Sequence, residues 1–256
     1  MRQSLRARGV VIAMAVLAAG IAATVSAQTA DELIAKNLEA RGGLDKLKAI
    51  ATMKMTGKVV TQGQEMQVIF WMKRPNLVLQ EMTFQGQKMA RAFDGQKAWM
   101  VNPFMGSSTP QEIPGPQSDL MKDNSDFDGP LVDYQAKGSK VELVGPDTVE
   151  GTKAYHLKVS QKNGRVTDVY LDAASGLEIK LVNEISQGGQ KIKIETLPSN
   201  YKSVSGVLMP HTIKSLVNGQ VQAEVTIDSI EIGILVDDSV FKMPRKGASS
   251  PGDSQP

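Results

Sequence analysis

The regular part of the chain begins with a pattern typical of an amphipathic helix. Thr29 and Glu32 stand three residues apart, as in a capping box, where hydroxyl and carboxylate satisfy free N–H groups at a helix start. Apolar residues then recur every three or four positions, and Gly42-Gly43 is typical of a helix end. A second, short helix is expected over residues 44–50. Each helix has one apolar face and needs an apolar surface to lie against.

After Thr52 the apolar positions recur every second residue, the period of a β-strand. The alternation is clearest in four segments: residues 65–73, 177–185, 191–196 and 221–228. Dipeptides such as Asn163-Gly164 and Asn218-Gly219 separate such segments and are typical of tight hairpins. The parity of the apolar positions reverses after Ile227, which predicts a β-bulge near Asp228-Ser229.

These segments predict a mainly β fold, a curled antiparallel sheet of about eleven strands that forms an incomplete, half-closed β-barrel. Residues 103–134 break the regularity, since they are rich in proline and glycine, with short helical turns expected at 118–122 and 131–134. Several strands carry apolar groups on both faces and need cover. The N-terminal helix and this insertion are the expected cover, a lid over the sheet. One domain is expected over residues 28–244, followed by a disordered tail, 245–256.

Residues 1–27 have the order of a cleaved, Sec-type signal peptide. Three arginines precede an apolar run, and the small pair Ser26-Ala27 follows it. A retained membrane anchor is the alternative, but the run is short of the roughly 20 residues that span a bilayer. We therefore expect a soluble, exported protein in the periplasm. It is not expected to be lipid-anchored, because no cysteine follows the run.

The composition narrows the chemistry. The 256 residues include no cysteine, which excludes disulfides, cysteine–zinc sites and iron–sulfur clusters. There are two histidines, His156 and His211. No nucleophile elbow or phosphate-binding loop occurs, so no catalytic residue, metal or cofactor is expected. Without the three arginines of the signal peptide, 26 of the 29 basic residues remain against 27 acidic ones. A near-neutral chain gives no charge-based case for nucleic-acid binding.

Methionines concentrate in the first part of the expected sheet. Nine of the 13 lie between Met53 and Met121. A flexible, polarizable thioether suits a surface that accepts apolar partners of variable shape. The sequence therefore predicts an apolar cavity on the concave face, although a methionine-rich core is the alternative. The candidate ligand-binding residues are Met53, Met55, Met66, Val68, Phe70, Met72, Met82, Phe84 and Trp99.

Two stretches resemble the LolA family of periplasmic lipoprotein carriers. Residues 71–77, WMKRPNL, resemble the family's W-x-K-R-P-N-L stretch, and residues 93–104 resemble the D-G-x-x-x-W-x-x-N-P-F stretch that follows it at similar spacing. Three later segments resemble the wider group of outer membrane lipoprotein-sorting proteins: residues 170–177, 201–213 and 240–244. The resemblance covers most of residues 30–244.

The resemblance implies an incomplete barrel whose helices close over an apolar cavity that binds acyl chains of lipoproteins or lipids. It implies that Arg74, the arginine of the K-R-P stretch, hydrogen-bonds lid backbone and latches the empty cavity. A guanidinium offers five donors for such a role. The alternative is a surface charge at a strand end. An inner-membrane transporter and an outer-membrane acceptor are the implied partners, and a monomer is expected.

Three classes of function follow from this pattern. The first is a periplasmic carrier that moves acyl chains toward the outer membrane. The second is a sensor similar to RseB and MucB, which use a related half-barrel to detect mislocalised lipids and normally carry a second C-terminal domain. An enzyme is the third class, for which no catalytic constellation is visible.

Overall fold

The computed structural model describes residues 28–187 and 189–244, so the expected signal peptide and the expected tail lie outside the described residues. Thirteen strands form one antiparallel sheet. The strands are β1 Thr52–Thr61, β2 Gln64–Lys73, β3 Leu77–Phe84, β4 Gln87–Asp94, β5 Ala98–Asn102, β6 Ser107–Glu112, β7 Lys140–Val149, β8 Thr152–Ser160, β9 Val166–Asp172, β10 Glu178–Gln187, β11 Gln190–Val204, β12 Val207–Val217 and β13 Gln220–Ile232. The helices are α1 Ala30–Ala40, α2 Leu44–Ala49 and α3 Gly115–Asn124, with 3-10 turns η1 Pro103–Met105 and η2 Asp238–Phe241.

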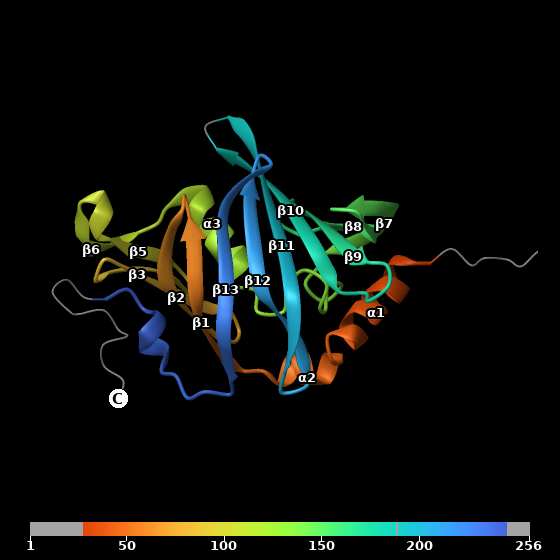
Figure 1. Ribbon diagram of the computed structural model, residues 1–256, viewed down its shortest axis with the longest axis horizontal. Coiled ribbons are helices and arrows are strands. Elements are labelled where there is room, and N and C mark those ends of the chain that lie inside the picture. The colour runs from red at the N-terminus through yellow and green to blue at the C-terminus, as the bar shows by residue number, and fades with distance from the viewer. Residues whose placement is uncertain (1–27, 188, 245–256) are drawn as a thin grey trace, which may run out of the picture.

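The sheet is curled but not closed. Its order is β6-β5-β4-β3-β2-β1-β13-β12-β11-β10-β9-β8-β7, so β6 and β7 are its two edges. Helix α3 contacts β4 and β5 on one side and β10 on the other, although six strands separate β4 from β10. The sheet must therefore curve around α3, and Figure 1 shows it arching over this helix. The predicted half-barrel is confirmed.

The stretch expected to be irregular holds regular structure. The sheet has thirteen strands instead of about eleven, and β6 lies within residues 103–134. Helix α3 follows it and is longer than the expected turn at 118–122. Residues 127–138, in contrast, form successive turns without a helix. Within the described part of the chain, no helix has the length and apolar character needed to cross a bilayer.

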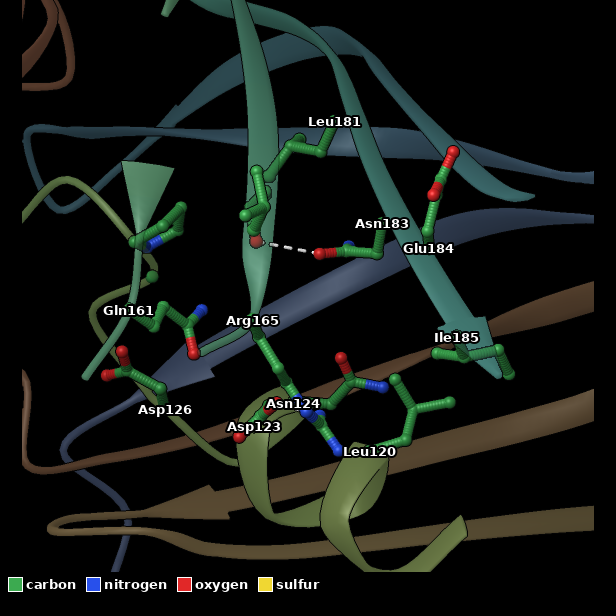
Figure 2. A pocket seen from close by; sticks show the side chains of 14 residues that line it. Leu120, Asp123, Asn124, Asp126, Gln161, Arg165, Leu181, Asn183, Glu184 and Ile185 are labelled. Carbon is green, nitrogen blue, oxygen red and sulfur yellow. Dashed lines mark hydrogen bonds and ion pairs between the residues drawn. The ribbon is translucent and has the colours of Figure 1, made fainter. Parts of the chain in front are cut away.

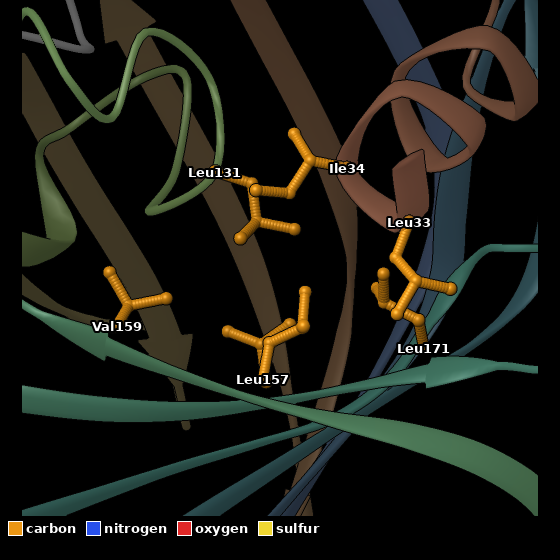
Figure 3. Close-up of a cluster of buried hydrophobic side chains, with 7 residues drawn as sticks. Leu33, Ile34, Leu131, Leu157, Val159 and Leu171 are labelled. Atoms are coloured by element: carbon orange, nitrogen blue, oxygen red, sulfur yellow. The ribbon is translucent and has the colours of Figure 1, made fainter. Parts of the chain in front are cut away.

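Helix α1 begins and packs as its sequence predicts. Thr29 Oγ1 accepts a hydrogen bond from Glu32 N at 3.2 Å, and Glu32 Oε2 accepts one from Thr29 N at 2.8 Å. The apolar face of α1 lies on the inner surface of β8 and β9, where one residue of the insertion joins it (Figure 3). This buried cluster contains Leu33, Ile34, Leu131, Leu157, Val159, Val169 and Leu171. The helix thus closes the β7 end of the sheet's inner face.

A β-bulge lies where the parity of apolar positions predicts it. Thr56 pairs with Ser229 and Gly57 with Ile227, which leaves Asp228 as the extra residue. A Cβ built on Gly57 would lie 2.1 Å from the carbonyl oxygen of Thr226, so only glycine fits this close approach. The extra residue reverses the alternation, so Ile230 and Ile232 lie on the same inner face as Ile227.

The outer face of the first strands has a cover that the pattern did not predict. Residues after β13 return across β3 and β4, where η2 contacts both strands. Val236 and Phe241 pack against Leu79, Ala92 and Trp99 in a buried cluster. The expectation that only the N-terminal helix and the insertion cover the sheet is therefore wrong. This cover explains why β2 and β3 are apolar on both faces.

Candidate functional site

Two neighbouring cavities lie on the inner face of the sheet, one against α3 and the other beside it. The first, of about 490 Å³, lies between α3 and strands β2 to β5. Its lining includes Met72, Val78, Met100, Ile113, Leu120 and Met121. The second, of about 680 Å³, continues toward β12 and β13. Its lining includes Val59, Met66, Met82, Phe84, Met89, Ile213 and Val225. Phe70, Gln80 and Arg91 line both, so these three residues mark the junction.

A third apolar cavity, of about 200 Å³, lies beneath α2. Its walls include Leu47 and Ile50 from the helical segment and Met53 and Met55 from β1. Ile213 lines both this cavity and the 680 Å³ cavity. The inner face therefore carries a row of apolar hollows from α3 to α2, and the two larger ones have the volume of small-molecule sites.

The structure brings eight of the nine candidate residues to this inner face. Met53 and Met55 line the cavity below α2, and Phe70 and Met72 line the cavity below α3. Three more candidates line the 680 Å³ cavity together with Phe70: Met66, Met82 and Phe84. Val68 has the parity of Met66 and Phe70 and is buried. Strand alternation alone places these side chains on one face.

Trp99 does not belong to the cavity. Its neighbours Ala98 and Met100 face the α3 side, so Trp99 faces the outer surface, where its indole N–H donates to the carbonyl oxygen of Phe241 at 2.7 Å. It is 1% exposed within the outer cluster. The prediction that placed it among the ligand-binding residues is corrected by the alternation of side chains along β5.

Arg74 ties the end of β2 to two parts of the cover. We call α1, α2, α3 and residues 125–139 together the helical cover. The Arg74 guanidinium donates from Nε to the carbonyl oxygen of Ile50 at 2.7 Å and from Nη2 to that of Leu47 at 3.0 Å. These carbonyls end α2, where backbone acceptors lack helical partners. The same group donates to both carboxylate oxygens of Asp128, each at 2.6 Å.

The pairing of Arg74 with Asp128 has a clear electrostatic signature. Hydrogen bonding to Arg74 lowers the pKa of the Asp128 carboxyl below its ordinary value of 3.8, and the carboxylate in turn raises the pKa of Arg74. Phe127 lies under the guanidinium, 4.8 Å from ring centroid to Cζ. Bidentate geometry and a cation–π contact both favour arginine over lysine at this position.

Two more contacts join residues 125–139 to the helices. Lys48 of α2 pairs with Asp133 at 2.6 Å, and the Tyr134 hydroxyl donates to Asp31 of α1 at 2.6 Å. Residues 125–139 therefore contact α1, α2 and the end of β2 through these polar groups and also through apolar ones, Leu131 against α1 and Phe127 against α2. Sequence reasoning missed Asp128, which lies in the insertion expected to be irregular, 54 residues from Arg74.

A further pocket, of about 230 Å³ and with both polar and apolar walls, lies on the other side of α3, between that helix and strands β9 and β10 (Figure 2). Arg165 reaches α3, where it pairs with Asp123 and, at 4.0 Å, with Asp119. The Thr167 hydroxyl donates to Asn183 Oδ1 at 2.7 Å, the dashed line in Figure 2. The arginine of this pocket is paired, and its walls mix polar groups with apolar ones such as Leu120 and Leu181.

The two histidines lie apart from the cavities. His156 Nε2 is 2.8 Å from Asp168 Oδ1, and its ring stacks on Tyr170 on the outer face of β8 and β9. His211 is buried in β12 with Nδ1 3.0 Å from the carbonyl oxygen of Met209. Among the described residues, no three His, Cys, Asp or Glu side chains are grouped so that they could hold a metal ion.

Comparison of sequences finds no relative, since no family model and no curated protein matches the chain. Comparison of structures does. A LolA superfamily protein from Nitrosomonas europaea superposes with a TM-score of 0.54 at 14% identity, over 84% of this chain and 98% of that one. The fold is LolA-like.

Two further structures superpose about as well on this LolA-like half-barrel. One is a DUF1329 family protein from Desulfovibrio piger, with a TM-score of 0.56, 11% identity, and 80% of this chain and 95% of that one covered. The other is a domain assigned to the outer membrane lipoprotein-sorting proteins, from Vibrio parahaemolyticus, with a TM-score of 0.53, 12% identity, and 81% and 97% covered. At such identities the likeness concerns the fold alone.

Proposed function

We propose that this protein is a periplasmic carrier that binds acyl chains of lipoproteins or lipids and moves them toward the outer membrane. The observation that carries the proposal is the row of apolar hollows beneath a helical cover that one arginine joins to the sheet. An apolar concavity must be covered while empty, because an exposed apolar patch promotes association. The same cover must open for cargo.

The lining of the hollows supports acyl chains as the cargo. Met66, Met72, Met82, Met89 and Met100 all face the row. Methionine side chains adapt to chains of different length and unsaturation because they have three flexible torsions and a polarizable sulfur. The described residues that line the two larger cavities include no nucleophilic side chain next to a basic one such as histidine, aspartate, glutamate or lysine. We therefore propose a binding function without catalysis.

The cover supports transfer as well as binding. Residues 125–139 join the sheet and the helices through polar contacts at Asp128, Asp133 and Tyr134, beside the apolar contacts of the same segment. In this proposal, making or breaking the polar contacts of Arg74 and Asp128 shifts the cover between two states that differ by a few kcal/mol. In this proposal a monomer takes its cargo from an inner-membrane transporter and gives it to an outer-membrane acceptor. Residues 1–27 direct its export.

The proposal is tested with a fluorescent fatty acid and one buried charge. Phe70→Glu places a carboxylate at the junction of the two larger cavities, where an acyl chain would have to desolvate it. The expected result is loss of probe binding with an unchanged circular dichroism spectrum. Val144→Glu is the matched control, because Val144 is 58% exposed on edge strand β7. Equal binding by a folded Phe70→Glu variant would contradict the proposal.

Transfer separates the carrier from the sensor. A carrier releases the bound probe to acceptor vesicles, whereas a sensor retains it and binds a partner protein instead. Release measured as a change in probe fluorescence on mixing with vesicles supports the carrier. Binding without release would favour the sensor.

A further inference from the structure

A single guanidinium stands at the junction of the two largest cavities. Arg91 of β4 lines both, opposite Gln80 of β3, its partner in the strand register. Arg91 Nε donates to Gln80 Oε1 at 2.5 Å. Gln80 is 8% exposed, so its amide is held in place by the wall around it. The pair forms a fixed polar point between two apolar hollows.

Arg91 has no carboxylate partner in the part of the chain that the structure describes. It is the one charged residue among the described residues that line the two cavities. Its Nη groups carry four N–H donors, and no acceptor among the described backbone and side-chain groups bonds to them. Arg74 shows the contrast, since all three of its guanidinium nitrogens donate, two of them to Asp128.

The surroundings make this unpaired charge unfavourable in the empty protein. The Arg91 side chain is open to solvent within the hollow, but the surrounding walls desolvate it and lower the pKa of its guanidinium. Arginine remains charged near neutral pH all the same. A cation in such a place is stabilised by an anion that supplies oxygen acceptors.

We propose that Arg91, held by Gln80, binds the anionic head group of an acyl amphiphile, a carboxylate or a phosphate, whose chains lie in the cavities on either side. The proposal rests on the proposed function and specifies its substrate class. A planar guanidinium with free Nη groups matches both kinds of oxyanion. The position at the junction requires that the apolar parts extend away from the head group along the row.

Displacement of a bound apolar dye tests this assignment with four compounds. Dodecanoate and dodecanol share a chain and differ in charge, a dodecyl phosphate carries the other anion, and inorganic phosphate has no chain. Wild-type protein is expected to prefer the two anionic amphiphiles over dodecanol by about tenfold or more, the worth of a charge-assisted hydrogen bond. Inorganic phosphate alone is expected to leave the dye bound, because it gains nothing from the hollows.

Variants assign the preference to Arg91. Arg91→Met is expected to bind dodecanol about as well as the wild type but to lose the preference for dodecanoate, and Arg91→Lys to retain part of it. Lys140→Met removes an exposed charge on β7 and should leave the preference intact. Equal affinity of the wild type for acid and alcohol, or an unchanged preference in Arg91→Met, would overturn the assignment. If Arg91→Met does not fold, the wild-type and Arg91→Lys ratios decide.

These outcomes are distinct from failure of the proposed function. If neither dodecanoate nor dodecanol displaces the dye, the hollows do not bind acyl chains. If both displace it equally well, the hollows bind chains and Arg91 does not select the head group. Displacement by inorganic phosphate alone would make the site an anion site without an acyl requirement, and would contradict the proposal.

Discussion

Arg74 joins elements that are distant in sequence. Its four hydrogen bonds reach α2 and Asp128, and each charge-assisted bond contributes roughly 1.5–3 kcal/mol. Their sum overstates the stabilisation of the closed cover, since the side chains of Arg74 and Asp128 keep 25% and 16% exposure. We estimate about 1–3 kcal/mol, below the range for a fully buried pair. That is enough to shift a cover between two states.

Arg74→Leu should open the cover without unfolding the sheet. The variant loses every bond from the guanidinium, so the ligand-free protein is expected to bind an apolar dye several-fold more strongly, and to release cargo to acceptor vesicles more slowly. Circular dichroism checks the fold. Arg74→Lys is the matched control. Its dye binding should fall between that of the wild type and that of Arg74→Leu, since an ammonium keeps the charge but cannot make the bidentate pair. Unchanged dye binding in a folded Arg74→Leu variant would reduce Arg74 to a surface charge.

Asp128 predicts how the cover responds to acid. Its pKa is lowered by Arg74 when the cover is closed and returns toward the ordinary 3.8 when it opens. The ionised carboxylate therefore stabilises the closed cover fully above that ordinary value, and the stabilisation is lost as the pH falls through the lowered pKa. Dye binding by the empty protein should stay low from pH 7 to about pH 4 and rise below it.

Asp128→Asn supplies the control for this pH profile. The amide keeps one acceptor and loses the charge, so dye binding should be raised at neutral pH and nearly flat down to the acid range. The fluorescence of buried Trp99 reports whether the sheet itself has unfolded. An identical acid rise in wild type and Asp128→Asn would show that another group controls the cover.

At the scale of elements, much of the fold could be predicted because strands and helices leave local signals. The capping box at Thr29, the helix before Gly42 and the bulge at Asp228 all stand where the pattern of residues predicts them. What could not be predicted depends on contacts between distant segments. The return of residues 236–241 over Trp99 is such a contact, and so is the pairing of Asp128 with Arg74.

Alternation has a second limit in the site itself. It shows which side chains of a strand share a face but not which face is concave. The sequence pattern therefore predicts Trp99 in the cavity wall, whereas the structure has Met100 there. Gln80 and Arg91 have the same parity as the apolar lining of their strands. As polar residues at apolar positions, they were the signal that could have pointed to the junction.

The bulge between β1 and β13 predicts how much stability the protein loses when one methyl group is added at Gly57. Gly57→Ala would place Cβ 2.1 Å from the Thr226 carbonyl oxygen, so the two strands must separate there. The expected loss in the free energy of unfolding is about 3 kcal/mol or more, at the upper end for overpacking. Urea unfolding followed by circular dichroism measures it.

Gly63→Ala is the matched control for the bulge. Gly63 has a φ of +75° but open space around its Cβ position, so its substitution tests backbone strain without a clash. A loss of about 1–2 kcal/mol is expected there. If Gly57→Ala costs no more than Gly63→Ala, the close approach at the bulge is not needed for the pairing of β1 with β13.

At the scale of the whole molecule, one curled sheet divides two tasks between its faces. The outer face of β2 to β5 is closed by the segment around η2, which stabilises the wall. The inner face keeps apolar hollows open beneath the helical cover, with Arg74 at the edge and Arg91 at the centre. This half-barrel thus combines a packed wall with a cover that Arg74 joins to the sheet, an arrangement suited to taking up a chain and releasing it.

The most direct test of this account is what the protein carries when it is isolated. Native mass spectrometry of the isolated protein, followed by lipid extraction, measures bound molecules without a probe. The account predicts about one acyl-bearing amphiphile per chain in the wild type and in Val144→Glu, and little or none in Phe70→Glu, whose charge occupies the junction of the cavities. A wild-type protein that carries no lipid and takes none up from vesicles would contradict it.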